Sequence, residues 1–161
     1  DYVIPPEQAR HYSEEILHLP NGFMPVGAPI PEPMELPSRS SQGLPEEGLV
    51  FCAFSGSYKL NRPLFELWLR ALQRYPESVL WLRAMNPLAQ ANLRSFAATR
   101  GIPPHRLVFA ERTPLPLHLQ RHRLADLFLD TFPYNQHSTA RDALRAGLPV
   151  LTLAGQTFAS R

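Results

Sequence analysis

Apolar residues from position 49 onward fall into short continuous runs separated by segments with helical spacing. Continuous runs are typical of strands buried on both faces, and helical spacing is typical of helices that cover a sheet. We predict strands at 49–54, 78–83, 106–110, 124–130 and 150–153, and helices at 63–75, 88–99, 115–121 and 138–145. Because strands and helices alternate, the fold class is α/β, with a parallel sheet covered on both faces. Right-handed crossovers then make it a doubly wound, Rossmann-like domain.

The predicted helices carry recognisable end signals. Asn61 is placed to cap the helix at 63–75, and Pro63 suits its first turn. Gly101 closes the helix at 88–99, and Gly147 closes the helix at 138–145.

The first part of the chain has a different pattern. Prolines crowd residues 20–47, and proline removes backbone donors and disfavours helix at the residue before it. We therefore expect an extended connector there, preceded by a short helix at 7–17. The chain opens without methionine and stops in the middle of a pattern at 158–161, so we expect a piece of a longer protein.

Composition narrows the class of protein. The 161 residues are 44% hydrophobic and 19% charged, which is globular, and a net charge of +2 is too small to imply a nucleic-acid or membrane partner. The chain has no apolar run of about 18 residues and no signal-peptide pattern at its start, so we expect a cytoplasmic protein. The single cysteine, Cys52, excludes an internal disulfide and is expected to be a buried thiol.

Candidate chemistry lies in the loops that follow the strands, because open parallel sheets bind ligands beyond the carboxyl ends of their strands. These loops concentrate small, polar and cationic residues at 55–59, 111–114, 131–139 and 154–157. No dinucleotide-binding glycine motif and no P-loop is present, so an NAD enzyme and a P-loop ATPase are disfavoured.

The turn at 135–139 leads directly into a predicted helix, whose unpaired N–H groups and partial positive charge make an anion site. The alternative is plain capping, since Thr139 and Asp142 have capping-box spacing. Lys59 follows the first strand and is placed either to bind a phosphate or to lie solvated on the surface.

Histidines give no metal motif. All six are scattered, and only His118 and His122 have i,i+4 spacing, without a nearby acidic third ligand. We interpret these two as histidines on a helix surface, and we expect no metal site. Nor does the order of residues indicate a nucleophilic triad or a pair of glycosidase carboxylates.

The chain resembles the O-linked N-acetylglucosamine transferases, particularly the bacterial ones, over nearly its whole length. The resemblance rests on the segments 51–60, 78–82, 124–131, 135–150 and 156–161. It implies a two-lobed GT-B glycosyltransferase in which this chain supplies the second, donor-binding lobe. Residues 1–44 then end the preceding lobe and form the connector, and residues 45–161 form the UDP-sugar-binding lobe, truncated at its C-terminal end.

The resemblance also implies an activity. N-acetylglucosamine passes from UDP-N-acetylglucosamine to serine or threonine hydroxyls of proteins, with inversion and with neither a metal nor another cofactor. Lys59 would neutralise the departing diphosphate, and His137, Ser138 and Thr139 would hold the phosphates. Lys59 and His137 are therefore the implied catalytic residues. Gly56 borders the donor where the animal enzymes have glutamine, and those enzymes read Gly-His-Thr-Thr where this chain has residues 136–139.

The remaining implied contacts are with the nucleoside. Asp142 would accept hydrogen bonds from the ribose hydroxyls, Thr113 and His118 would border the uracil and ribose, and Arg121 would pack near the base. Leu115 stands where the animal enzymes have a lysine. Further implied partners are the preceding catalytic lobe and tetratricopeptide repeats in the parent chain.

Two other functions remain open at this stage. One is a module that binds a sugar nucleotide without transferring it. The other is a GT-B transferase that uses another UDP-sugar and an acceptor that is not a protein.

Overall fold

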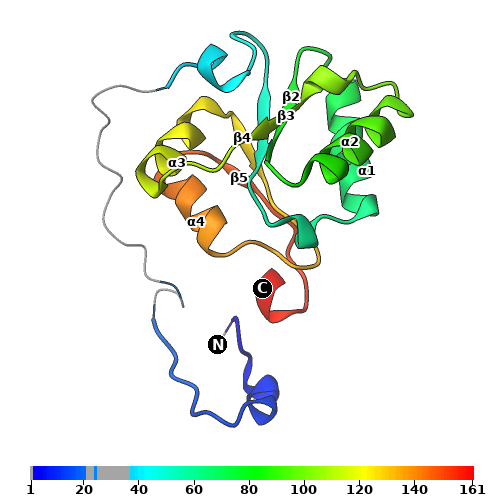
Figure 1. The fold of residues 1–161 in the computed structure, drawn as a ribbon. Coiled ribbons are helices and arrows are strands. Elements are labelled where there is room, and N and C mark those ends of the chain that lie inside the picture. The colour runs from blue at the N-terminus through cyan, green and yellow to red at the C-terminus, as the bar shows by residue number, and fades with distance from the viewer. Residues whose placement is uncertain (1, 21–23, 25–36) are drawn as a thin grey trace.

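The structure, a computed structural model, describes residues 2–20, 24 and 37–161. It contains a sheet of five parallel strands in the order β3-β2-β1-β4-β5 (Figure 1). The strands are β1 (Val50–Ala53), β2 (Val79–Arg83), β3 (Leu107–Ala110), β4 (Leu127–Leu129) and β5 (Val150–Leu151). The prediction of a parallel sheet from continuous apolar runs is confirmed.

Helices cover the sheet from both sides. The helices α1 (Arg62–Arg74) and α2 (Pro87–Ala98) lie on one face, and α3 (Leu115–Arg121) and α4 (Ser138–Arg145) lie on the other (Figure 1). This division follows from right-handed crossovers, because the chain reverses direction across the sheet between β3 and β4. The doubly wound, Rossmann-like prediction is therefore confirmed.

Alternate residues of the strands supply two separate cores. In β1, Phe51 packs toward α1 and α2, whereas Val50 and Cys52 pack toward α3 and α4. Cys52 is fully buried, as expected, and burial raises the pKa of its thiol.

Helix ends follow the signals in the sequence. The side chain of Asn61 accepts a 3.0 Å hydrogen bond from the backbone N–H of Leu64 and so caps α1. Gly101 and Gly147 have positive φ, 74° and 81°, after α2 and α4. The cap of α2 is Asn86, so this helix begins earlier than its apolar spacing predicted.

Three predicted elements are shorter in the structure. Residue 124 closes a 3-10 turn after α3, so β4 occupies only the end of the predicted strand at 124–130. The predicted strand at 150–153 is reduced to β5, which pairs only with β4 in the described part of the chain. The predicted helix at 7–17 is a 3-10 helix, Pro6–His11, which begins at the second of two adjacent prolines.

The predicted extended connector lies partly outside the described residues, which omit 21–23 and 25–36. Its described end contains a 3-10 turn at Ser40–Gln42, so it is not extended throughout. None of the helices in the described part is long and apolar enough to cross a membrane.

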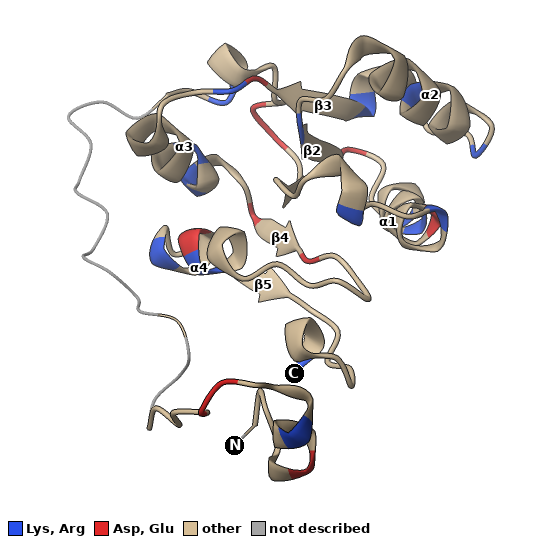
Figure 2. Ribbon diagram, turned by 60° about the horizontal axis from the view of Figure 1, so that its bottom comes forward, with Lys and Arg blue, Asp and Glu red and all other residues tan. Residues whose placement is uncertain are grey.

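Arg39 bonds the described end of the connector to the sheet. Its guanidinium donates to the carbonyl oxygens of Leu124 and Gly48, at 3.1 and 3.0 Å, and pairs with the Asp126 carboxylate at 2.8 Å. The same Asp126 oxygen accepts the N–H of Val50 at 2.8 Å. Asp126 is the acidic residue just before β4, so this clamp holds the amino ends of β1 and β4, opposite the loops that follow the strands (Figure 2).

We predict that Arg39→Ala lowers the free energy of unfolding by about 1–3 kcal/mol, because Asp126 and two backbone carbonyls lose a charged donor. Denaturant unfolding of the protein that carries this chain measures the change. The exposed Arg70 on α1 is the matched control, and Arg70→Ala should change stability by less than about 0.5 kcal/mol. Equal losses in the two variants would show that the clamp does not stabilise the fold.

Candidate functional site

The loop that follows β4 is organised by the buried carboxylate of Asp130. One oxygen accepts the backbone N–H groups of Thr131 and Gln136, at 2.7 and 2.8 Å. The other accepts the Asn135 amide at 3.1 Å and the Thr152 hydroxyl at 2.7 Å. Because these donors come from the loop and from the residue after β5, Asp130 fixes the turn that leads into α4.

The start of α4 is not capped by a side chain. His137 is the N-cap residue and makes no side-chain cap hydrogen bond. The capping-box alternative is wrong, because Thr139 lies inside the helix and Asp142 pairs with Arg141 and Arg145, at 3.1 and 3.7 Å. The first-turn N–H groups, which a helix cannot pair internally, therefore lack a cap from the His137 side chain and suit an anion.

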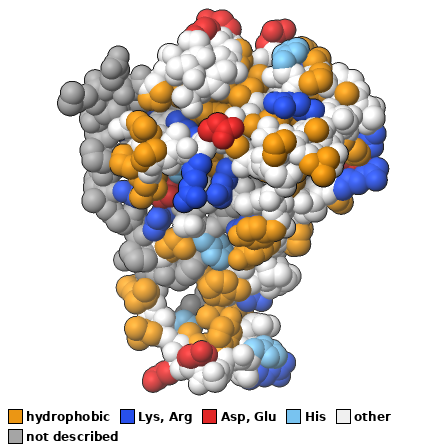
Figure 3. All heavy atoms as spheres, viewed as in Figure 1, with side chains coloured by type: hydrophobic (Ala, Val, Ile, Leu, Met, Phe, Trp, Pro, Cys, Tyr) orange, Lys and Arg blue, Asp and Glu red, His pale blue; other side chains and the backbone are white. Residues whose placement is uncertain are grey.

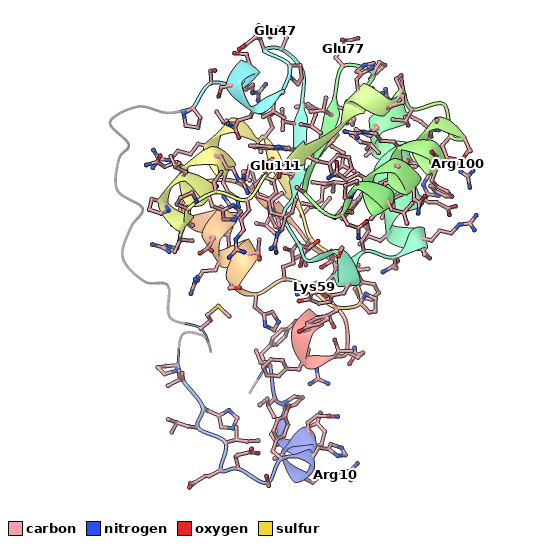
Figure 4. All side chains as sticks on the ribbon, viewed as in Figure 1. Arg10, Glu47, Lys59, Glu77, Arg100 and Glu111 are labelled. Atoms are coloured by element: carbon pink, nitrogen blue, oxygen red, sulfur yellow. The ribbon has the colours of Figure 1, made fainter. Side chains whose placement is uncertain are left out.

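Lys59 reaches this turn from the loop after β1. Its amine donates a 3.0 Å hydrogen bond to the carbonyl oxygen of Asn135 and lies 4.0 Å from the centre of the Tyr134 ring (Figure 4). Burial lowers the pKa of the Lys59 amine, and the Asp130 carboxylate opposes that shift. The solvated-lysine alternative therefore does not describe Lys59, which is held against the turn before α4.

His137 is flanked by the segment after β5. Its ring lies 5.7 Å from the ring of Phe158, and its Nε2 is 3.4 Å from the carbonyl oxygen of Ala159. That segment is closed by a capping box between Thr157 and Ser160. Loops from three strands, β1, β4 and β5, thus meet around the start of α4.

A second group of side chains is centred on Arg121 in α3, which is only 3% exposed. Its guanidinium donates to the carbonyl oxygen of Glu111 at 2.7 Å, contacts the Nδ1 of His118 at 2.6 Å, and lies 4.6 Å from the Phe54 ring. A guanidinium can only donate, so Nδ1 of His118 must accept. The ring of His118 is therefore neutral and carries its proton on Nε2.

The prediction that His118 and His122 lie on a helix surface is wrong for His122, and His118 is half-buried. His122 is completely buried, and both rings pack on Phe54, at 5.4 and 5.1 Å. The i,i+4 spacing places His118 in α3 and His122 at the start of the following 3-10 turn on one face, and that face is turned toward the sheet. Burial, followed by the Arg121 charge, lowers the pKa of His118 to about 4. Burial also lowers the pKa of His122.

Asp142 and Thr113 belong with this second group, whereas Gly56 lies in the loop that carries Lys59. Asp142 is close enough to His122 to raise its pKa and partly offset the effect of burial. The Thr113 hydroxyl is buried without a hydrogen-bond partner in the described structure. At Gly56, an added Cβ would collide with the ring of Tyr58, which occupies the space that a larger side chain would need.

The structure therefore arranges the predicted residues in two groups. Lys59 lies at the turn that contains His137, Ser138 and Thr139. His118 and Arg121 lie with Phe54, in contact with the loop that contains Thr113, while Leu115 is exposed at the start of α3. Figure 3 shows Lys and Arg side chains gathered near the centre of the viewed face.

Within the described residues, no group of three or more His, Cys, Asp and Glu comes together as possible metal ligands.

Sequence analysis missed two residues that shape the site, Asp130 and Tyr134. The sequence does contain a signal for Asp130, because an acidic residue at the end of an apolar strand is costly to bury unless several donors bond it. It contains no signal for Tyr134, because the role of Tyr134 depends on Lys59, which is far away along the chain and lies against its ring.

Comparison with known proteins agrees with this architecture. The family model described as glycosyl transferase family 41 matches residues 19–161. The chain belongs to glycosyltransferase family 41.

Two relatives are named as transferases of N-acetylglucosamine to peptides. The probable UDP-N-acetylglucosamine–peptide N-acetylglucosaminyltransferase SEC of Arabidopsis thaliana is 34% identical over all of this chain, which covers 17% of that protein. The UDP-N-acetylglucosamine–peptide N-acetylglucosaminyltransferase of Caenorhabditis elegans is 35% identical over 84% of this chain and 12% of that protein. The chain therefore spans less than one fifth of the length of either relative.

A solved structure shares the fold. A mutant of the Thermobaculum terrenum O-GlcNAc transferase superposes with a TM-score of 0.82 and 27% identity, over all of this chain and 30% of that one.

We predict that Asp130→Asn loosens the turn before α4, because an amide offers one acceptor where the carboxylate accepts from four donors. The free energy of unfolding should fall by about 1–3 kcal/mol, measured by denaturant unfolding. Thr152→Val, which removes one of those donors, should cost less, about 1 kcal/mol. A larger loss from Thr152→Val would contradict the central role of Asp130.

We predict that His118 titrates near pH 4 in an NMR pH titration. The unfolded chain binds this proton near pH 6.5, so the free energy of unfolding should decrease as the pH falls from about 6.5 toward 4. Arg121→Met removes a positive charge that lowers the pKa and should raise the pKa of His118. An unchanged pKa in a folded Arg121→Met protein would contradict this account.

Proposed function

We propose that the protein carrying this chain transfers N-acetylglucosamine from UDP-N-acetylglucosamine to serine or threonine hydroxyls of proteins, and that this chain binds the donor. Family membership and the named activities of the relatives support the proposal. The observation that carries it is the position of the Lys59 amine, held 3.0 Å from the Asn135 carbonyl beside the uncapped start of α4.

This arrangement suits the departure of UDP. As the glycosidic bond breaks, negative charge develops on the diphosphate, and preorganised positive groups lower the energy of that state. Lys59 supplies a full charge, and the N-terminus of α4 supplies unpaired N–H groups and a partial charge. His137, Ser138 and Thr139 add side-chain contacts to the phosphates. We infer inversion and no requirement for a metal from the family.

The second group of side chains suits the nucleoside. The neutral ring of His118 and the unpartnered Thr113 hydroxyl border the uracil and ribose, with the backbone beside Gly56, and Asp142 accepts hydrogen bonds from the ribose hydroxyls. Arg121 is buried, so we assign it a positioning role: it holds the His118 ring and the loop after β3.

The rest of the reaction is assigned to the parent protein. The chain covers 17% of the Arabidopsis relative, so we place the acceptor site in the preceding lobe, with residues 1–44 ending that lobe and residues 45–161 forming the donor lobe. Tetratricopeptide repeats belong to the same proposal, as does a cytoplasmic location, which suits a free buried thiol at Cys52.

We predict that Lys59→Ala in the complete protein lowers the rate of transfer to a protein acceptor by about 10²–10³-fold, as removal of one charge-stabilising group does. Transfer of radiolabelled sugar from UDP-N-acetylglucosamine measures the rate. Arg100, which lies far from Lys59 (Figure 4), is the matched control, and Arg100→Ala should retain the unaltered rate.

The same assay separates the alternatives. Near-normal turnover by Lys59→Ala would remove Lys59 from the mechanism. Binding of UDP-N-acetylglucosamine without transfer to any protein would favour a sugar-nucleotide-binding module. Faster transfer from UDP-glucose, or to a small-molecule acceptor only, would identify a different transferase.

A further inference from the structure

Gln136 is buried in an unusual state. Its side chain is 5% exposed, and neither its amide nitrogen nor its amide oxygen has a hydrogen-bond partner in the described structure. The amide oxygen of the neighbouring Asn135 is likewise buried without a partner. Buried polar groups in folded proteins are nearly always paired, so adjoining unpaired amides indicate that something else completes them.

A cavity of about 800 Å³ lies against these amides. Gln136 and Asn135 line it together with His137, Ala140, Thr152 and Ala154, so it runs from the start of α4 to the segment after β5. Its volume is within the range of small-molecule sites.

The unpaired atoms define the chemistry of the missing group. Two of them, the amide oxygens, accept hydrogen bonds, and one, the Gln136 nitrogen, donates. Arg141 and Arg145 also line the cavity and suit an anion, but at the two amide oxygens themselves an anion would meet only acceptors. Sugar hydroxyls donate and accept, and an acetamido group offers an N–H beside a carbonyl oxygen, which complements the amide of glutamine.

We propose that Gln136 is a specificity-determining residue that binds the hydroxyl or acetamido groups of the donor sugar. This inference rests on the proposed function, because the sugar is bonded to the diphosphate that His137 contacts, one residue further along the chain.

UDP and UDP-N-acetylglucosamine differ only in the sugar, so their affinities for the complete protein test the inference. Calorimetry on Gln136→Met, which keeps the volume and removes both polar atoms, should show UDP-N-acetylglucosamine bound about 10-fold more weakly, the loss expected for one or two hydrogen bonds. UDP should bind as it does to the unaltered protein. The melting temperature should be unchanged or higher, because the variant no longer buries an unpaired amide.

The exposed Gln73 on α1 is the matched control, and Gln73→Met should bind both ligands normally. Equal weakening of UDP and UDP-N-acetylglucosamine, or no weakening of either, would overturn the role of Gln136 and leave the proposed function standing. A loss of melting temperature in Gln136→Met would show that the amide is part of the fold's own hydrogen bonding and would also overturn it. Failure of the unaltered protein to bind UDP would overturn the proposed function itself.

Discussion

The buried carboxylate of Asp130 is the interaction on which the site depends. An ionised carboxylate is costly to bury, and here four donors from the loop after β4 and from the residue after β5 offset that cost. The same bonds fix the backbone carbonyl that receives Lys59 and set the direction in which α4 begins. The hydrogen bonds of Asp130 thus determine both where Lys59 lies and how α4 begins.

Arg121 and Lys59 are both cations, and the difference in their burial gives them different roles. Arg121 lies almost wholly inside the protein, where its two terminal nitrogens bond a carbonyl and a histidine nitrogen and its guanidinium lies over an aromatic ring. Lys59 has one hydrogen bond to a carbonyl and one ring contact, and its amine keeps donors for a ligand. Only the second cation is placed to respond to charge that appears on a bound molecule.

The sequence predicted the architecture well because the fold is encoded locally. Continuous apolar runs identified the strands, and Asn61, Gly101 and Gly147 marked helix ends through their own backbone and capping preferences. It failed where the outcome depends on tertiary contacts. The spacing of His118 and His122 gives a shared face but not the direction of that face, and the capping-box spacing of Thr139 and Asp142 yields to the pairing of Asp142 with two arginines. The roles of Asp130 and Gln136 could not be predicted, because they depend on residues that are distant along the chain and lie close only in the folded structure.

The hydrogen bond from Arg121 to His118 also sets the protonation state of the His118 ring. A histidine whose Nδ1 is occupied by a guanidinium, and whose pKa is lowered to about 4, cannot take up a proton near neutral pH. Its ring therefore keeps one protonation state, with the proton on Nε2, through any physiological change in acidity. Under the proposed function, a proton released by an acceptor hydroxyl would have to travel to a different group.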